Sequence, residues 1–338
     1  MNCKSAEISA ISFYLPDEII NNQQLVDEFG TWKPEKIFHK TGINERRVAK
    51  KELVSDMAVA AAENLFEEYD LDRKEVDFLI LCTETPDFIM PATACIVHDR
   101  LGLSKHTGAF DYNLGCSGYI YGLAMAKSMV VSGIASKVLL LTADVLTRFI
   151  NPMDKSTRTI FGDAATATVV SESSKSYGIG KFVFGTDGSG SGDLTIPAGG
   201  MAIPKTQETG HERKNRFGNV RTEENFYMNG PEVLKFSLRE VPPVVKNVLE
   251  ENDLSIPMAD LFIFHQATKL VLEHIRDILE IPGEKFFMNM EKLGNTVSST
   301  IPLALKQASK EKKLKKGQKV VLVGFGVGYS WGACVVEW

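Results

Sequence analysis

Residues 111–119 read DYNLGCSGY and residues 294–305 read GNTVSSTIPLAL, and these two stretches decide the fold. Each follows a short apolar segment and opens a run of small and apolar residues with helical spacing. Farther upstream, the apolar strands DFLILCTE, from Asp77, and DLFIFHQ, from Asp260, stand at corresponding places. Short apolar strands that alternate with helices predict an α/β protein.

The same order of elements occurs twice along the chain. Strand, helix, strand, helix, strand, strand runs from DFLILCTE to AATATVVSE, and again from DLFIFHQ to GACVVEW. Such an internal duplication predicts two similar halves, residues 1–175 and 176–338, packed about a pseudo-twofold axis. The boundary falls in the polar run SESSKS, residues 171–176. Cys116 and Asn295 then hold equivalent places, where the second helix of each half begins, and both are expected at the centre.

Composition excludes several classes of protein. The formal net charge of −5 over 338 residues does not favour the concentrated basic face of a nucleic-acid-binding protein. No apolar run approaches the roughly 20 residues that cross a bilayer, and the first ten residues lack a signal-peptide pattern. The five cysteines are odd in number and never in CxxC spacing. We therefore expect a cytoplasmic protein without disulfides or a metal site, in which a functional cysteine acts as a thiol.

Cys116 is placed for nucleophilic chemistry. It follows a predicted strand, lies between Gly115 and Ser117, and begins a predicted helix. The free backbone N–H groups and partial positive charge of a helix start favour a thiolate. The competing interpretation is a small buried residue at a crowded turn, where free cysteine is common.

Two further polar residues are expected beside this cysteine. His265 ends the strand LFIFH, at the edge where α/β sheets place active groups, although a buried core histidine fits the same position. Asn295 alone fits a helix N-cap, but the duplication brings it opposite Cys116. The backbone N–H near Val327, in GFGVGYSWG, could join that of Cys116 as an oxyanion hole. A tight hairpin between the last two strands explains those glycines equally well.

Four motifs together resemble a known family. GCSG at 115–118, HQA at 265–267, GNT at 294–296 and GFGVGYSWG at 324–332 have the order and spacing of 3-oxoacyl-[acyl-carrier-protein] synthase III, a member of the thiolase superfamily. The resemblance covers essentially the whole chain. It implies a thiolase-like five-layered αβαβα fold and a cytoplasmic homodimer. It also implies acyl-CoA and malonyl carrier protein as substrates, no metal or redox cofactor, and no nucleic acid or membrane.

By this resemblance the chain is a condensing acyltransferase of lipid metabolism. Cys116 takes an acyl group from acyl-CoA or an acyl carrier, and decarboxylative Claisen condensation with a malonyl thioester gives a 3-oxoacyl product. His265 and Asn295 match the pair that binds the malonyl thioester oxygen. The N–H groups of Cys116 and Val327 would hold the oxygen of the acyl-cysteine carbonyl. The reaction would initiate fatty-acid biosynthesis or serve a related polyketide or lipid pathway.

Motif position also assigns residues that would bind the substrates. Met90 matches a bulky residue that reaches the acyl pocket of the partner subunit, and its flexibility predicts a primer longer than acetyl. Other candidate walls of that pocket are Leu146, Phe161 and Leu194. Candidate contacts to coenzyme A or the carrier are Lys40, Lys155, Thr268 and Lys269. Thr268 departs from the family pattern, which has asparagine there, and Leu270 stands where the family has arginine.

Glu84, in CTETPD, is a further departure. It ends the strand before the Met90 segment and points toward the expected site. Hydroxymethylglutaryl-CoA synthases carry an acid in a similar TE motif, which makes Glu84 a candidate accessory acid or base; a variable polar residue without a catalytic role is the competing interpretation. Two other functions stay open: a non-decarboxylating condensing enzyme of the hydroxymethylglutaryl-CoA synthase or head-to-head type that uses Glu84, and a simple cysteine-dependent acyltransferase.

Overall fold

Two mixed five-stranded sheets frame the molecule in the computed structural model, which describes residues 5–173 and 178–338. The first sheet has the order β1 (Ser5–Tyr14), β7 (Ala164–Ser173), β6 (Lys137–Asp144), β4 (Phe78–Cys82), β5 (Gly108–Tyr112). The second has the order β8 (Ile179–Thr186), β16 (Ser330–Glu337), β15 (Lys319–Gly326), β13 (Leu261–Phe264), β14 (Phe286–Phe287). In both sheets the first three strands pair antiparallel and the last two join in parallel. This match confirms the duplicated α/β fold.

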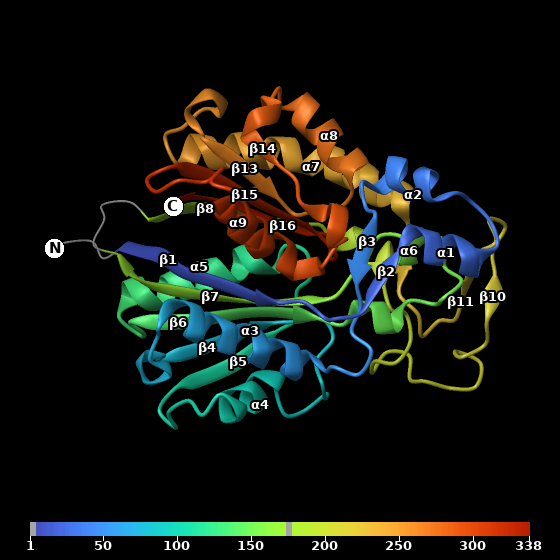
Figure 1. The fold of residues 1–338 in the computed structure, drawn as a ribbon, viewed down its shortest axis with the longest axis horizontal. Helices are drawn as coiled ribbons and strands as arrows, with labels where there is room; N and C mark the ends of the chain where they lie inside the picture. The colour runs from blue at the N-terminus through green and yellow to red at the C-terminus, as the bar shows by residue number, and fades with distance from the viewer. Residues whose placement is uncertain (1–4, 174–177) are drawn as a thin grey trace.

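Helices complete five layers (Figure 1). One outer layer covers the first sheet and the other covers the second, while two helices lie between the sheets. The outer helices are α3 (Val54–Tyr69) and α4 (Thr93–Arg100) on the first sheet, and α7 (Gly230–Glu251) and α8 (Lys269–Ile278) on the second. The central helices are α5 (Gly118–Ser132) and α9 (Thr300–Lys310). The predicted αβαβα order is confirmed.

Each half is longer than the repeat seen in the sequence. Strand β1 and helix α3 precede the repeat in the first half, and β8 and α7 precede it in the second. These elements hold equivalent places, because β1 pairs with β7 as β8 pairs with β16. The predicted boundary between residues 175 and 176 falls in 174–177, outside the described residues.

The central layer explains the composition of α5. This helix touches β6 and β7 of the first sheet and β15 and β16 of the second. A helix packed between two sheets needs apolar residues on the faces that meet them, and GYIYGLAMAKSMVVS contains a single charged residue. Tyr119, Ile120 and Leu123 of α5 are fully buried and share one hydrophobic cluster with Ile301 and Leu305 of α9.

The starts of the central helices are tied to the opposite half by matching hydrogen bonds. Ser117, the N-cap of α5, shares a 2.6 Å hydrogen bond with Ser330 of the second sheet. Ser299, the N-cap of α9, shares a 2.8 Å hydrogen bond with Thr142 of the first sheet. The expected equivalence of Cys116 and Asn295 is therefore wrong in detail. The residue that precedes the second N-cap is Ser298, because a 3-10 turn over Val297–Ser299 precedes α9.

The remaining elements cover one end of the two sheets, to the right in Figure 1. They are β2 (Ile19–Asn21), α1 (Asn22–Phe29), α2 (Pro34–Thr41), β3 (Glu45–Arg47), α6 (Lys155–Arg158), β9 (Leu194–Thr195), β10 (Arg213–Lys214), β11 (Val220–Arg221) and β12 (Tyr227–Met228). Residues 199–225, predicted as an irregular surface excursion, are mostly exposed and contain the β10–β11 pair. Among the described residues, no helix has the length and apolar character needed to span a membrane.

Truncation of a central side chain tests the layer that joins the halves. Ile301→Ala is expected to lower the free energy of unfolding by about 2–5 kcal/mol, because it leaves a cavity between two sheets that cannot close. Ile278→Ala, at an exposed position of α8, is the matched control and should change stability by less than about 0.5 kcal/mol. Chemical denaturation followed by circular dichroism measures both. Equal effects of the two variants would contradict a shared central core.

Candidate active site

An apolar cavity of about 550 Å³ lies where the two halves meet. Cys116, from the first half, lines it together with His265 and Asn295 from the second. The three side chains predicted to converge therefore share one cavity, although they are far apart in sequence. Glu84 lines the same cavity.

Cys116 lies between β5 and α5, two residues before the helix begins. Gly326 lies against its side chain, since a Cβ added there would come within 2.9 Å of the Cys116 Sγ atom. Burial raises the pKa of the Cys116 thiol well above its ordinary value, and the charges of Glu84 and Asp144 raise it further. The backbone N–H groups of Cys116 and Val327 act in the opposite direction. The N–H groups therefore favour the thiolate, but burial opposes it more strongly.

His265 follows β13 directly and is almost fully buried. Its Nδ1 atom lies 2.8 Å from the hydroxyl of Thr300, and its ring meets the edge of Phe325 with 5.6 Å between ring centroids. Burial lowers the pKa of His265 to about 3, against a smaller opposite effect of the Val297 backbone. The imidazole is therefore neutral at physiological pH.

Asn295 faces the other nitrogen of this ring. Its Nδ2 atom lies 3.3 Å from His265 Nε2. An amide nitrogen can only donate, so Nε2 accepts and the ring proton resides on Nδ1, where Thr300 accepts it. The Thr300 hydroxyl in turn donates to the carbonyl of Val297, at 3.0 Å.

Val297 holds both partners through its backbone. Its N–H donates to Asn295 Oδ1 at 2.9 Å, and its carbonyl accepts from Thr300. Its φ angle is +54°, a left-handed conformation that costs a β-branched residue about 1–3 kcal/mol. This conformation turns the N–H toward Asn295 and the carbonyl toward Thr300, and so fixes the geometry of the pair.

A second acidic side chain contacts the backbone of Glu84. Asp144, at the end of β6, is buried and accepts hydrogen bonds from the Glu84 backbone N–H at 2.8 Å and from the Ser298 hydroxyl at 2.7 Å. Burial raises the pKa of Glu84 to about 8, and the charge of Asp144 raises it as well. Burial also raises the pKa of Asp144, to about 7. The pair therefore does not carry two full negative charges at neutral pH.

The structure places most of the predicted acyl-pocket residues in this cavity. Leu146, Phe161 and Leu194 line it, but Met90 does not. Met90 is 81% exposed, on a loop with Ile89 and Phe88, which are also exposed. Sequence analysis missed the wall contributed by Phe226, by Met228 of β12, and by Val233 and Leu234 of α7.

The candidate contacts to coenzyme A or the carrier fall in different places. Lys40 and Thr268 line the cavity. Lys40 also lies 5.7 Å from the ring of Trp32, on a surface rich in lysine. Thr268 caps α8 by accepting from the Val271 N–H. Lys269 lies near Glu273, 3.7 Å away, and is absent from the cavity wall formed by the described residues.

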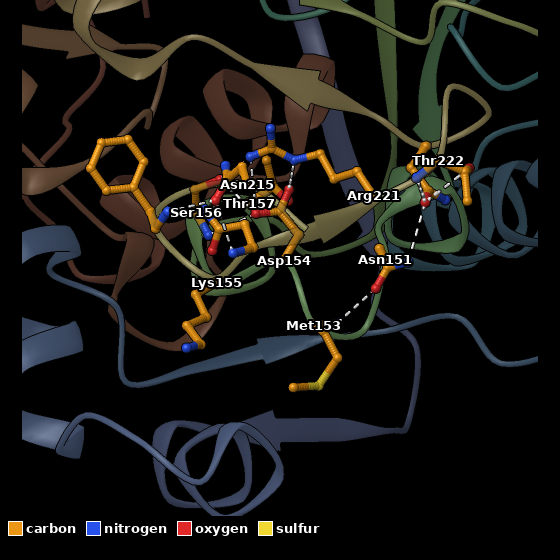
Figure 2. A network of polar contacts seen from close by, with 12 residues as sticks. Asn151, Met153, Asp154, Lys155, Ser156, Thr157, Asn215, Arg221 and Thr222 are labelled. Atoms are coloured by element: carbon orange, nitrogen blue, oxygen red, sulfur yellow. Dashed lines mark hydrogen bonds and ion pairs between the residues drawn. The ribbon is translucent and has the colours of Figure 1, made fainter. Parts of the chain in front are cut away.

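Lys155 stands apart from the cavity wall formed by the described residues. It begins α6, beside the buried Asp154, whose carboxylate pairs with Arg221 of β11. Figure 2 shows that the Lys155 side chain points away from this network. Its ammonium lies 6.0 Å from the ring of Phe29. The network thus holds α6 against residues 199–225 and turns Lys155 toward α1.

Thr300, Val297 and Ser298 are site residues that sequence analysis did not single out. They lie in GNTVSST, directly after Asn295. A cluster of hydroxyl residues between a turn and an apolar helix was the available signal. Their contacts to His265 and Asp144, however, depend on elements more than thirty residues away.

Known proteins share both the sequence and the fold. Family models of 3-oxoacyl-[acyl-carrier-protein (ACP)] synthase III and of its C-terminal part match residues 110–188 and 249–338. The beta-ketoacyl-[acyl-carrier-protein] synthases III of Caldanaerobacter subterraneus subsp. tengcongensis and Clostridioides difficile are 36% and 37% identical to this chain. The alignments cover 99% and 100% of this chain and 98% and 99% of the relatives.

The solved structures agree. A crystal structure of 3-oxoacyl-(acyl-carrier-protein) synthase III is 45% identical and superposes with a TM-score of 0.97, over 99% of this chain and all of the other. The Thermus thermophilus beta-ketoacyl-[acyl carrier protein] synthase III is 35% identical, with a TM-score of 0.87, over 98% of this chain and 99% of the other. The chain therefore belongs to the 3-oxoacyl-[acyl-carrier-protein] synthase III family of condensing acyltransferases with a thiolase-like fold.

Proposed function

We propose that this enzyme primes fatty-acid synthesis by joining an acyl group, carried on Cys116, to malonyl-[acyl-carrier protein]. One observation carries the proposal: a thiol, a neutral imidazole and a carboxamide from two halves of the chain line one apolar cavity. A thiol supplies a covalent acyl carrier. Two uncharged donors in an apolar site suit an oxyanion that forms during the reaction.

The first half-reaction is thioester exchange. The sulfur of Cys116 attacks the carbonyl of an acyl thioester, the bond to the CoA sulfur breaks, and acyl-Cys116 and free CoA result. In the resting enzyme, the backbone N–H groups of Cys116 and Val327 lower the pKa of the thiol. The carbonyl oxygen of the thioester would lie near these N–H groups. Such preorganised donors stabilise the tetrahedral oxyanion.

The second half-reaction joins the two substrates. Loss of carbon dioxide from the malonyl thioester leaves an enolate, whose carbon attacks the acyl-Cys116 carbonyl and releases the cysteine. Asn295 Nδ2 and His265 Nε2 face each other in the resting enzyme, and a substrate oxygen between them would be held by both. Nε2 becomes a donor when the ring proton moves from Nδ1 to Nε2. Rotation of the Thr300 hydroxyl toward Nδ1 supports that tautomer, since this hydroxyl lies 2.8 Å from Nδ1 and 3.0 Å from the Val297 carbonyl.

A homodimer completes the acyl pocket in this proposal. Among the described residues, β5 has a strand neighbour on one side only, and an unpaired strand edge favours pairing with another chain. Phe88, Ile89 and Met90 are 56%, 93% and 81% exposed. An exposed apolar segment of this kind marks an interaction surface. Met90 of the partner subunit would then close the pocket lined by Leu146, Phe161 and Leu194 and restrict the primer length.

Incubation with acyl-CoAs tests the nucleophile. We expect intact-protein mass spectrometry to show one acyl adduct per chain with a panel from acetyl- to dodecanoyl-CoA, with the larger adduct fraction for primers longer than acetyl. The apolar cavity of about 550 Å³ is the physical reason. Cys116→Ala should remove the adduct, while Cys95→Ala, at an exposed cysteine, should keep it. An adduct that survives in Cys116→Ala would contradict the assignment.

Asn295→Ala separates the two half-reactions. Loss of one oxyanion donor costs about 10²–10³-fold in rate, so condensation with malonyl-[acyl-carrier protein] should fall by that factor. Formation of acyl-Cys116 should persist, because the carboxamide is assigned to the malonyl oxygen. Both rates can be followed with radiolabelled acyl-CoA. An unchanged condensation rate would remove Asn295 from the mechanism and favour a simple acyltransferase.

A charge on the outer side of α5 tests the dimer. Met125 lies with Tyr121, Met129 and Phe184 in a shallow apolar hollow, which the dimer would cover. Met125→Glu should shift the sedimentation coefficient from that of a dimer to that of a monomer, because the buried charge would lack a partner. Met258→Glu alters an exposed methionine in the 3-10 turn Ile256–Met258 and should remain dimeric. A wild-type protein that sediments as a monomer at micromolar concentration would contradict the proposal.

A further inference from the structure

Glu84 is an ionisable cavity residue that the reaction described above does not use. It follows β4 by two residues and lines the cavity together with Cys116. Its carboxyl lies against Gly115, the residue before the nucleophile, where an added Cβ would be 2.4 Å from Glu84 Oε2 and 2.8 Å from Val327 Cγ1. The carboxyl is therefore next to the turn that presents the thiol.

Among the described residues, the Glu84 side chain has no hydrogen-bond partner. Its backbone N–H donates to Asp144, but within the described part of the chain no group donates a hydrogen bond to its carboxyl oxygens. A partly buried carboxyl without a partner is costly, and such a group commonly serves a substrate or a proton transfer.

Several ionisable groups share the cavity with this carboxyl or adjoin it. They are Asp144 at the end of β6, Cys82 in β4, Cys116 before α5, His265 after β13 and Lys40 in α2. The pKa of Glu84 is raised to about 8, by burial first and by Asp144 second. The carboxyl therefore exchanges a proton readily near neutral pH.

His265 is a weak acceptor for the thiol proton. Both of its ring nitrogens are engaged, Nδ1 by Thr300 and Nε2 by Asn295. Burial also opposes a positive charge on the ring and lowers its pKa to about 3. A carboxylate that becomes neutral when it takes the proton avoids this cost, because protonation removes a buried charge.

We propose that Glu84 is a catalytic residue that takes the proton of the Cys116 thiol during acyl transfer. This inference rests on the proposed function. As Sγ bonds to the thioester carbonyl carbon, the S–H bond breaks and its proton passes to the Glu84 carboxylate. The bond between that carbon and the CoA sulfur then breaks, and the CoA thiolate takes the proton back from Glu84. The step exchanges one thiol and thioester for another and needs no further reactant.

Two reactions of Cys116 distinguish this role from simple charge repulsion. The Glu84 carboxylate raises the pKa of the thiol, so Glu84→Gln should lower that pKa. Alkylation by iodoacetamide uses thiolate that has already lost its proton to solvent, and it expels iodide, which needs no proton. It should therefore proceed at least as fast at pH 7 in the variant, whose thiolate fraction is larger. Acyl transfer expels a thiolate, which does need a proton, and should slow by about 10²-fold, the usual contribution of general acid–base catalysis.

The experiment measures both rates between pH 6 and pH 9.5. Rapid-quench mass spectrometry follows acylation by the preferred acyl-CoA without malonyl substrate, and iodoacetamide labelling gives the thiol pKa. Wild-type acylation should fall as the pH drops below about 8, because the base must be ionised. Glu84→Gln should lose that dependence, and Glu84→Asp, which keeps a carboxylate, should retain part of the rate. Asp87→Asn, in the same loop, is the control and should match the wild type in both reactions.

Each outcome decides the inference. Slower acylation with undiminished alkylation in Glu84→Gln supports it. Acylation as fast as in the wild type would show that Glu84 only repels the thiolate, and a parallel loss of both reactions would show a structural role; either result overturns it. If Glu84→Gln fails to fold, Glu84→Asp decides, and a pH profile identical to that of the wild type with an unreduced rate overturns the inference. A wild-type enzyme that no acyl-CoA acylates would instead overturn the proposed function.

Discussion

Burial of α5 and α9 between two sheets is the constraint on which the site depends. Each helix contacts both sheets, so neither half can shift without opening the shared core. The N-cap serines make this relation reciprocal, because Ser117 bonds to the second sheet and Ser299 to the first. The thiol precedes one of these caps, and the segment that carries Asn295 precedes the other. The distance between nucleophile and carboxamide is thus set by the packing of the core.

The same packing gives the cavity an apolar lining, and this low polarity has opposite consequences for the two half-reactions. An apolar cavity strengthens every hydrogen bond to a developing oxyanion, which favours decarboxylation. It also disfavours the thiolate and the imidazolium, since burial raises the pKa of the Cys116 thiol and lowers that of His265. The thiol and the imidazole are therefore uncharged at rest. Charge appears on them only during turnover, and the residues around them must supply donors and proton acceptors at that moment.

The sequence predicted the order of elements well, because the repeat consists of short apolar strands that alternate with helices. Four short apolar strands in each half predicted the order of elements, and the resemblance to the synthase III family implied the five layers. The first strand and helix of each half were missed, since β1 and β8 alternate or mix polar residues and lack a distinctive motif. Cys116, His265 and Asn295 were predicted from motif and position together. The place of Asn295 relative to the start of α9 was not predicted correctly.

What escaped prediction depends on backbone conformation and on long-range contacts. The left-handed φ of Val297 cannot be read from a β-branched residue, for which that region is unfavourable. The 3-10 turn that this conformation starts displaces Asn295 from the N-cap expected for it, and leaves Ser298 to bind Asp144. Asp144 in turn holds the Glu84 backbone. Val297, a strained residue before α9, therefore positions the His265–Asn295 pair directly and the Glu84–Asp144 pair indirectly. The donors assigned to condensation and the carboxyl beside the thiol that carries the acyl group thus depend on the same backbone conformation.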